Sequence, residues 1–152
     1  MLSRRLAREA AVRALFQIDV GRSHPEEALA YNIQELAVPE PAADYARVVV
    51  HGTLDHLPQI DALISKYTVG WSLDRLPLTD RMVLRLAVFE LDHLRDQVPV
   101  AVVISEAVEL AKMYGDATSG RYINGILASV ASALNRTDDG TLGQEPESPV
   151  KQ

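Results

Sequence analysis

The residues of this chain best suited to chemistry are arginines gathered at its start. Residues 1–22 carry five arginines against one glutamate and one aspartate, a net charge of +3, whereas the whole chain carries −6. A positive charge set against the trend of a molecule is typical of a surface that contacts an anion. In a chain without a phosphate-binding loop motif, the leading candidate is a nucleic-acid backbone. The cluster therefore predicts RNA or DNA binding.

The helix that positions these arginines is predicted over Leu6–Val20, a stretch without Gly or Pro whose apolar residues recur at intervals of three and four. At 100° per residue, Arg4, Arg8 and Arg5 fall at about 0°, 40° and 100° around the helix axis. We expect three guanidinium groups to project together from the helix start. The helix dipole disfavours cations there, so another interaction must select them. The alternative is a solvated face on which the arginines pair with Glu9 and other acids.

A second candidate site is the glycine-containing turn at 113–125, which opens the last predicted helix. A helix N-terminus offers unpaired N–H groups to an anion, Arg121 adds a charge, and Tyr122 adds a ring that can stack on an exposed base. Half-burial in the core is an equally good interpretation of Tyr122. Gly125 costs about 1 kcal/mol relative to Ala inside a helix, so close packing or close approach of a ligand is expected there.

The elements that carry these residues all have the helical period, and no hairpin turn lies between alternating strands. Val48–Val50 is ambiguous because β-branched residues favour a strand, but its flanks favour a helix. Thr79 and Ser119 are expected to cap the central and last helices. The sequence predicts an all-α protein of about seven helices in two small bundles, with helices over 6–20, 25–37, 42–57, 58–67, from 79, from 99 to 114 and from 119.

The division of the chain follows from its loops. The segment around residues 73–79 separates sub-bundles predicted at about 1–70 and 77–136 of one helical domain, 1–136. From Thr137 onward the sequence is polar, acidic and interrupted by Gly and Pro. Such a segment cannot bury enough apolar surface to fold, so residues 137–152 are predicted to form a disordered tail.

Composition excludes several classes of function. The chain has 152 residues, 47% of them apolar, which is enough for a core, and it contains no Cys, so disulfides, thiolate metal sites and a Cys nucleophile are ruled out. The four histidines lack metal-ligand spacing, and no catalytic or cofactor-binding motif occurs. No apolar stretch approaches 18 residues, and the charged start is unlike a secretory signal. We expect a cytoplasmic protein that is not an enzyme and needs no metal or cofactor.

Five segments in a fixed order also resemble a known family. They are RLAREAAVRALF at 5–16, DRMVLRLAVFEL at 80–91, VP at 98–99, ISEAVELAK at 104–112 and YINGIL at 122–127. Together they resemble the transcription antitermination factor NusB family, over residues 4 to about 135. The resemblance implies a double three-helix bundle that pairs with NusE, a small-subunit ribosomal protein. It also implies binding of boxA single-stranded RNA and support of read-through by the RNA polymerase antitermination complex.

The resemblance assigns roles to particular residues. Arg4, Arg5 and Arg8 match the arginine-rich start of the family that contacts RNA. The turn matches a second RNA-contacting region, and the two would form one surface. A partner-facing group matches positions near the NusE side, where an acidic Asp80 would meet a basic protein. The turn residues are Thr118, Gly120, Arg121 and Tyr122, and the partner-facing residues are Asp80, Arg81 and Arg85.

Departures and alternatives accompany the resemblance. Leu6 stands where some relatives have arginine, Thr118 where some have an acid, and Phe16 where many have tyrosine. Charge and hydrogen bonding at the RNA surface therefore differ from theirs. Some relatives form homodimers, which leaves monomer and homodimer both open. The competing functions are a NusB-like domain put to another use, as in fused ribosomal RNA methyltransferases, and a purely protein-binding bundle with an acidic partner.

Overall fold

Helices fill the chain as the 3.6-residue period predicts. The computed structural model describes residues 2–68 and 72–138, and no strand occurs in these two ranges. The helices are α1 (Leu2–Gly21), α2 (Pro25–Glu35), α3 (Glu40–Asp55), α4 (Leu57–Lys66), α5 (Leu78–His93), α6 (Val100–Tyr114) and α7 (Ala117–Asp138), with a 3-10 turn, η1 (Leu73–Arg75), before α5. The predicted all-α fold with seven helices is confirmed.

The helix boundaries confirm some expectations and correct others. Val48–Val50 lies inside α3, so the helical flanks outweigh the strand preference of its side chains. Thr79 does not cap α5, because Pro77 takes the cap position and the helix already begins at Leu78. Ser119 does not cap the last helix either. α7 begins at 117, and the Asp116 carboxylate accepts the backbone N–H of Ser119 at 3.1 Å, as an N-cap residue does.

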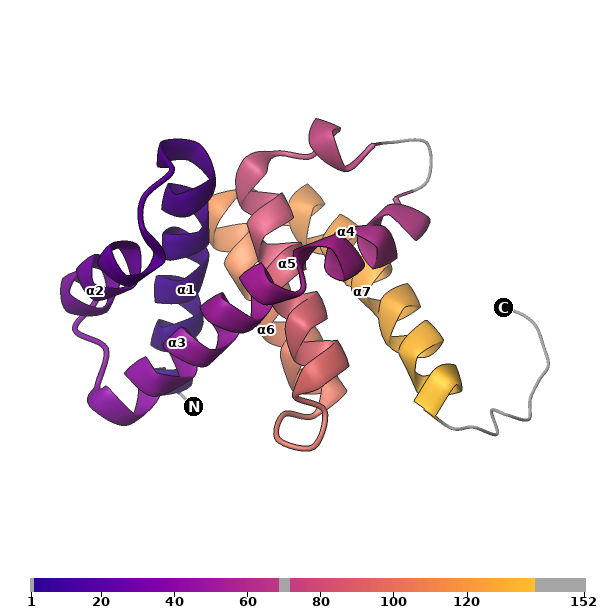
Figure 1. Cartoon of the computed structure of the whole chain (residues 1–152). Coiled ribbons are helices and arrows are strands. Elements are labelled where there is room, and N and C mark those ends of the chain that lie inside the picture. Colours follow the sequence, from indigo (N-terminus) through magenta and orange to yellow (C-terminus); the bar gives the residue numbers. More distant parts are fainter. Residues whose placement is uncertain (1, 69–71, 139–152) are drawn as a thin grey trace.

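The arrangement places α5 at the centre (Figure 1). α5 packs against α1, α3, α4, α6 and α7, while α2 packs on α1 and α3 at one side, and α6 and α7 pack against each other. Ten of the 16 residues of α5 are buried, and the half-buried Arg81, Arg85 and Asp92 share the one stripe without buried residues. A helix that is apolar nearly all round lies in the interior, which is where its neighbours enclose it.

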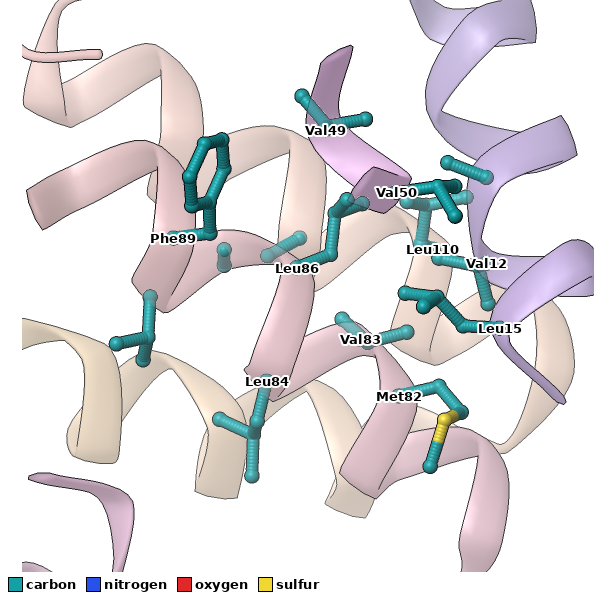
Figure 2. Packing of buried hydrophobic residues seen from close by; sticks show 14 of the residues in the cluster. Val12, Leu15, Val49, Val50, Met82, Val83, Leu84, Leu86, Phe89 and Leu110 are labelled. Carbon is teal, nitrogen blue, oxygen red and sulfur yellow. The ribbon is translucent and has the colours of Figure 1, made fainter. Parts of the chain in front are cut away.

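The core is continuous through the bundle (Figure 2). Figure 2 shows Val12 and Leu15 from α1 beside Val50 from α3 and Leu110 from α6, next to the apolar side chains of α5. Full burial of side chains of this size stabilises the fold by about 1.5–3 kcal/mol each. The side chains of the core therefore fix the relative positions of the helices that carry the arginines.

Small residues let α1 lie close to its neighbours. Ala7, Ala10, Ala11 and Ala14 are each 0% exposed. Alanine has the highest helix propensity and a short side chain, so these positions favour the helix and allow the α1 backbone to approach α3 and α5. This close approach brings the first turns of α1 within reach of side chains on α3, α5 and α6.

Parts of the sequence-based organisation stay predictions. The division into sub-bundles at about 1–70 and 77–136 is one of them. Because α5 contacts helices from both ranges, the helix contacts do not separate two sub-bundles. The predicted tail begins at 137, whereas α7 continues to Asp138; residues 139–152 lie outside the described residues. Trp71, in the predicted loop, also lies outside them. Among the described helices, none has the length and apolarity needed to cross a membrane.

Candidate nucleic-acid interface

Arg8, one of the three predicted RNA-contacting arginines of α1, is buried. Its side chain is 3% exposed and that of Glu90 on α5 is 2% exposed. Arg8 Nε donates to both carboxylate oxygens of Glu90, at 3.2 and 3.0 Å, and Nη2 lies 2.9 Å from Oε2. The Tyr45 hydroxyl of α3 donates to the same carboxylate. The expectation that three guanidinium groups project together from the helix start is therefore wrong for Arg8, which turns into the interior.

The ionisation of this buried cluster follows from its contacts. Burial opposes the charged guanidinium, but the hydrogen bonds and the charge of Glu90 outweigh burial and raise the pKa of Arg8. Burial, followed by the charge of Glu90, raises the pKa of the Tyr45 hydroxyl. Arg8 is thus a cation and Tyr45 a neutral donor at neutral pH, both held by one carboxylate that links α1, α3 and α5.

Arg4 and Arg5 diverge from Arg8 to opposite sides. The Arg4 guanidinium lies over the Tyr45 ring, 4.1 Å from its centroid, in a cation–π contact on the α3 side. Arg5 reaches α6, where its Nε and Nη2 each donate to one oxygen of Glu106 at 2.8 Å. The Arg5 side chain remains 45% exposed. The structure separates the predicted cluster into one buried arginine, one half-buried arginine and one exposed arginine.

Arg13 lies on the same side as Arg5, and sequence reasoning did not select it because its helical angle falls away from the other three. Its Nε donates to the Tyr114 hydroxyl at 2.9 Å, and its Nη2 donates to Glu9 at 3.1 Å. Its side chain is 37% exposed. The hydrogen bond that Arg13 donates to Tyr114 raises the pKa of Arg13, with burial opposing the shift.

These pairings fix the direction of the surface. Arg5 meets Glu106 and Arg13 meets Tyr114, so α1 and α6 run in the same direction and are bridged by these long side chains. Arg5 and Arg13 are eight residues apart on α1, as are Glu106 and Tyr114 on α6. Eight residues of helix span about 12 Å. We call this strip of α1 and α6 the α1–α6 edge. It leads from the arginines at the start of α1 to the turn that follows α6.

The turn between α6 and α7 is held by carboxylates. Asp116 caps α7, and the Ser119 hydroxyl donates to Asp80 Oδ2 at 3.1 Å. Thr118 and Arg121 are exposed, and Arg121 Nη2 lies 3.4 Å from the Thr118 hydroxyl. The structure therefore places two of the predicted turn residues on the surface, side by side.

Gly120 and Gly125 differ in their surroundings. Gly120 is buried, and a Cβ there would lie 3.1 Å from the Lys112 side chain and 3.4 Å from that of Val108, so this glycine allows α7 to approach α6. Gly125 is exposed, and a Cβ there would meet nothing within 4 Å. Of the two expectations for Gly125, close packing is therefore wrong, because the position faces open space, while close approach of a ligand stays a prediction.

Tyr122 combines the two interpretations left open by the sequence. It is half-buried and packs against the core, and it also lines a pocket of about 370 Å³ at the turn. Burial raises the pKa of its hydroxyl, so the ring is neutral at neutral pH. The pocket residues are Leu76, Pro77, Asp80, Asp116, Thr118, Ser119 and Tyr122.

The predicted partner-facing residues are engaged within the fold. Asp80 is 3% exposed, and burial raises its pKa although the Ser119 hydrogen bond opposes the shift. Arg81 donates to the backbone carbonyls of Asp74 and Leu76. Arg85 donates to both carboxylate oxygens of Asp61 at 2.9 Å and is 12% exposed. The expected display of an acidic Asp80 on the surface is not found, since the carboxylate faces the turn.

Over residues 2–68 and 72–138, the fold and these side chains define a seven-helix, all-α domain with exposed arginines along one edge. Its sequence matches the NusB family over residues 5–132. The chain belongs to the NusB family. The predicted family resemblance is confirmed.

Relatives and solved structures agree over most of the chain. The transcription antitermination protein NusB of Bacillus subtilis is 40% identical over 136 residues, covering 90% of this chain and 100% of the relative. The NusB of Desulforamulus reducens is 42% identical over 129 residues, covering 85% and 90%. The structure of T. maritima NusB gives a TM-score of 0.78 at 42% identity, covering 85% of this chain and 90% of that chain.

One similar structure contains further molecules. It is described as antitermination factors NusB and NusE in complex with dsRNA. The matched chain has a TM-score of 0.79 and 32% identity, and the match covers 88% of this chain and 98% of that one.

Proposed function

We propose that this chain is a transcription antitermination factor that binds boxA-type single-stranded RNA together with NusE. In this role it supports read-through of terminators by RNA polymerase in the cytoplasm, as part of the antitermination complex. The observation that carries the proposal is membership of the NusB family over residues 5–132. The likeness to a NusB chain crystallised with NusE and dsRNA supports it. We assign the chain no catalytic step.

We assign the RNA surface to the α1–α6 edge and the turn that follows it. Arg5, Thr118 and Arg121 are exposed and supply cations and a hydroxyl to the backbone. Tyr122 supplies a ring for stacking, and Gly120 supports the turn by letting α7 lie close to α6. Exposed groups at both ends of one continuous edge support a single RNA path.

Arg4 and Arg8 act differently from Arg5 in this proposal. Arg4 contributes charge at the margin of the surface, above the Tyr45 ring. Arg8 holds the start of α1 against α5 through Glu90 and thereby positions its two neighbours. Its contribution to RNA binding is indirect, since its guanidinium is buried.

For the NusE contact we retain the region around the start of α5. Asp80, Arg81 and Arg85 shape that region through the hydrogen bonds they make within the fold, rather than by presenting free charges. Monomer and homodimer are both open, and the mass of the purified protein by light scattering distinguishes them.

Fluorescence anisotropy with a short boxA-type RNA tests the proposed function. The RNA is titrated with the protein, with and without NusE, beside a scrambled RNA of equal length and a double-stranded RNA. We expect tight binding to the boxA-type strand that NusE strengthens, and weak binding to the scrambled strand. Equal binding to both single strands, or none with NusE present, would contradict the proposal.

Arg5→Ala is expected to weaken boxA-type RNA binding by roughly three- to tenfold and to lower the slope of log K against log salt by about 0.7, because one cation–phosphate contact is lost. Lys66→Ala at the end of α4 makes the same change in charge outside the predicted site. We expect Lys66→Ala to leave the slope unchanged. An unchanged slope in Arg5→Ala would remove Arg5 from the surface.

Tyr122→Ala is expected to weaken RNA binding by about fivefold, near the lower end for one stacked base, because half of the ring is already buried in the fold. The salt slope should stay the same, since no charge changes. Tyr122→Phe keeps the ring and should bind as the parent protein does. If Tyr122→Phe lost as much affinity as Tyr122→Ala, the hydroxyl rather than stacking would explain the effect.

A further inference from the structure

Arg5, an exposed arginine of the proposed RNA surface, is already held by a carboxylate. Arg5 and Glu106 form a two-point pair in which Nε meets Oε1 and Nη2 meets Oε2, both at 2.8 Å. Glu106 is 17% exposed, so the carboxylate is fixed on α6 while the guanidinium remains accessible. This pairing uses Nε and Nη2 and leaves Nη1 outside the pair.

The ion pair with Glu106 offsets the positive charge that Arg5 brings to the proposed RNA surface. The hydrogen bond from Arg5 lowers the pKa of Glu106, so the carboxylate is ionised at neutral pH. Glu90 similarly compensates Arg8. An approaching polyanion therefore meets fewer uncompensated cations at the start of α1 than the sequence suggests.

We propose that Glu106 determines the specificity of the RNA surface by masking Arg5 from unselected polyanions and fixing its orientation for the selected RNA. The inference rests on the proposed function. A two-point pair holds a planar guanidinium in one direction, which spares the entropy of ordering it. Only an RNA that binds along the turn and the α1–α6 edge places a phosphate next to the Arg5 N–H groups that Glu106 does not use. Other polyanions meet a neutralised pair.

The test is Glu106→Gln, which keeps the size of the side chain and removes its charge. We expect binding of the scrambled RNA to tighten about two- to fivefold, a range that corresponds to one partly exposed ion pair. For the scrambled RNA, the slope of log K against log salt should steepen by about 0.7, as for one further phosphate contact. Binding of the boxA-type RNA should change less, because gained charge and lost orientation oppose each other. The ratio of the two affinities should therefore fall.

Glu109→Gln is the matched control. Glu109 lies on the same helix three residues later, is 50% exposed and pairs with Lys112 at 3.6 Å. Its loss changes the net charge equally and leaves both hydrogen bonds between Arg5 and Glu106 in place, so both RNAs should tighten by one common factor. In an Arg5→Ala background, Glu106→Gln should have no effect beyond this factor. If Glu106→Gln also changed both RNAs equally, Glu106 would act only through overall charge and the inference would be overturned.

A second measurement separates failure of the inference from failure of the proposed function. If the parent protein binds neither RNA, the proposed function fails, but masking can still be measured with heparin as a polyanion. Glu106→Gln should then elute from heparin at higher salt than Glu109→Gln. Elution of both variants at the same salt would overturn masking, and equal thermal unfolding of the variants would show that the fold is intact.

Discussion

Glu90→Ala should lower the free energy of unfolding by about 3–5 kcal/mol, the range for removing one partner of a buried ion pair. The carboxylate is 2% exposed and accepts hydrogen bonds from Arg8 and Tyr45. Its removal leaves a guanidinium and a hydroxyl in the interior without their acceptor. Urea denaturation followed by circular dichroism measures the change.

A double substitution tests whether the cost comes from the unpaired charge. Arg8→Met with Glu90→Leu replaces both charges by apolar side chains, and such replacements of buried pairs are often neutral or stabilising. We expect the double variant to recover most of the stability lost in Glu90→Ala. A loss below about 1 kcal/mol in Glu90→Ala would contradict the structure, because it would mean that water or another group satisfies Arg8.

The fold could be predicted from the sequence because the apolar period is continuous within each helix. α5 illustrates this point, since Val83, Leu84, Ala87, Val88 and Leu91 recur at the helical period in the sequence, and all five are buried. Helix starts were less predictable. Proline at 77 and Asp116 compete with the neighbouring hydroxyl residues for the cap positions, and local sequence does not decide such competition.

The candidate site was only partly predictable because helical angles do not show what faces a residue. The helical angles correctly place Arg4, Arg5 and Arg8 in one sector of α1. Within that sector, however, Arg4 contacts α3, Arg8 contacts α5 and Arg5 contacts α6. One signal could have identified the buried arginine. Arg8 lies three and seven residues before buried Ala11 and Leu15, and is therefore in the register of the core.

The sequence position of Glu90, the partner of Arg8, indicates burial in the same way. Glu90 follows Val83, Leu86 and Ala87 by seven, four and three residues, so it also stands in core register. An arginine and a glutamate that both occupy core positions predict a buried pair, since an isolated buried charge is too costly. The pairing of Arg5 with Glu106 has no comparable signal, because both residues belong to surface faces that tertiary packing brings together.

Gly52→Ala should lower the free energy of unfolding by about 3 kcal/mol, the upper end of the usual range for overpacking. A Cβ at Gly52 would overlap the ring of Phe89, which is 5% exposed. The ring cannot turn away easily, because it stacks on His93 with centroids 5.1 Å apart and lies 6.0 Å from the His56 ring. Urea denaturation again gives the change.

Gly125→Ala provides the matched comparison, because Gly125 also lies within a helix but a Cβ there meets nothing within 4 Å. Without a clash, the better helix propensity of alanine should stabilise the protein by up to about 1 kcal/mol. Opposite signs for the two substitutions would assign the loss in Gly52→Ala to the Phe89 ring. In a Phe89→Ala background, Gly52→Ala should then cost little, and an undiminished cost there would show that the strain lies in the α3 backbone instead.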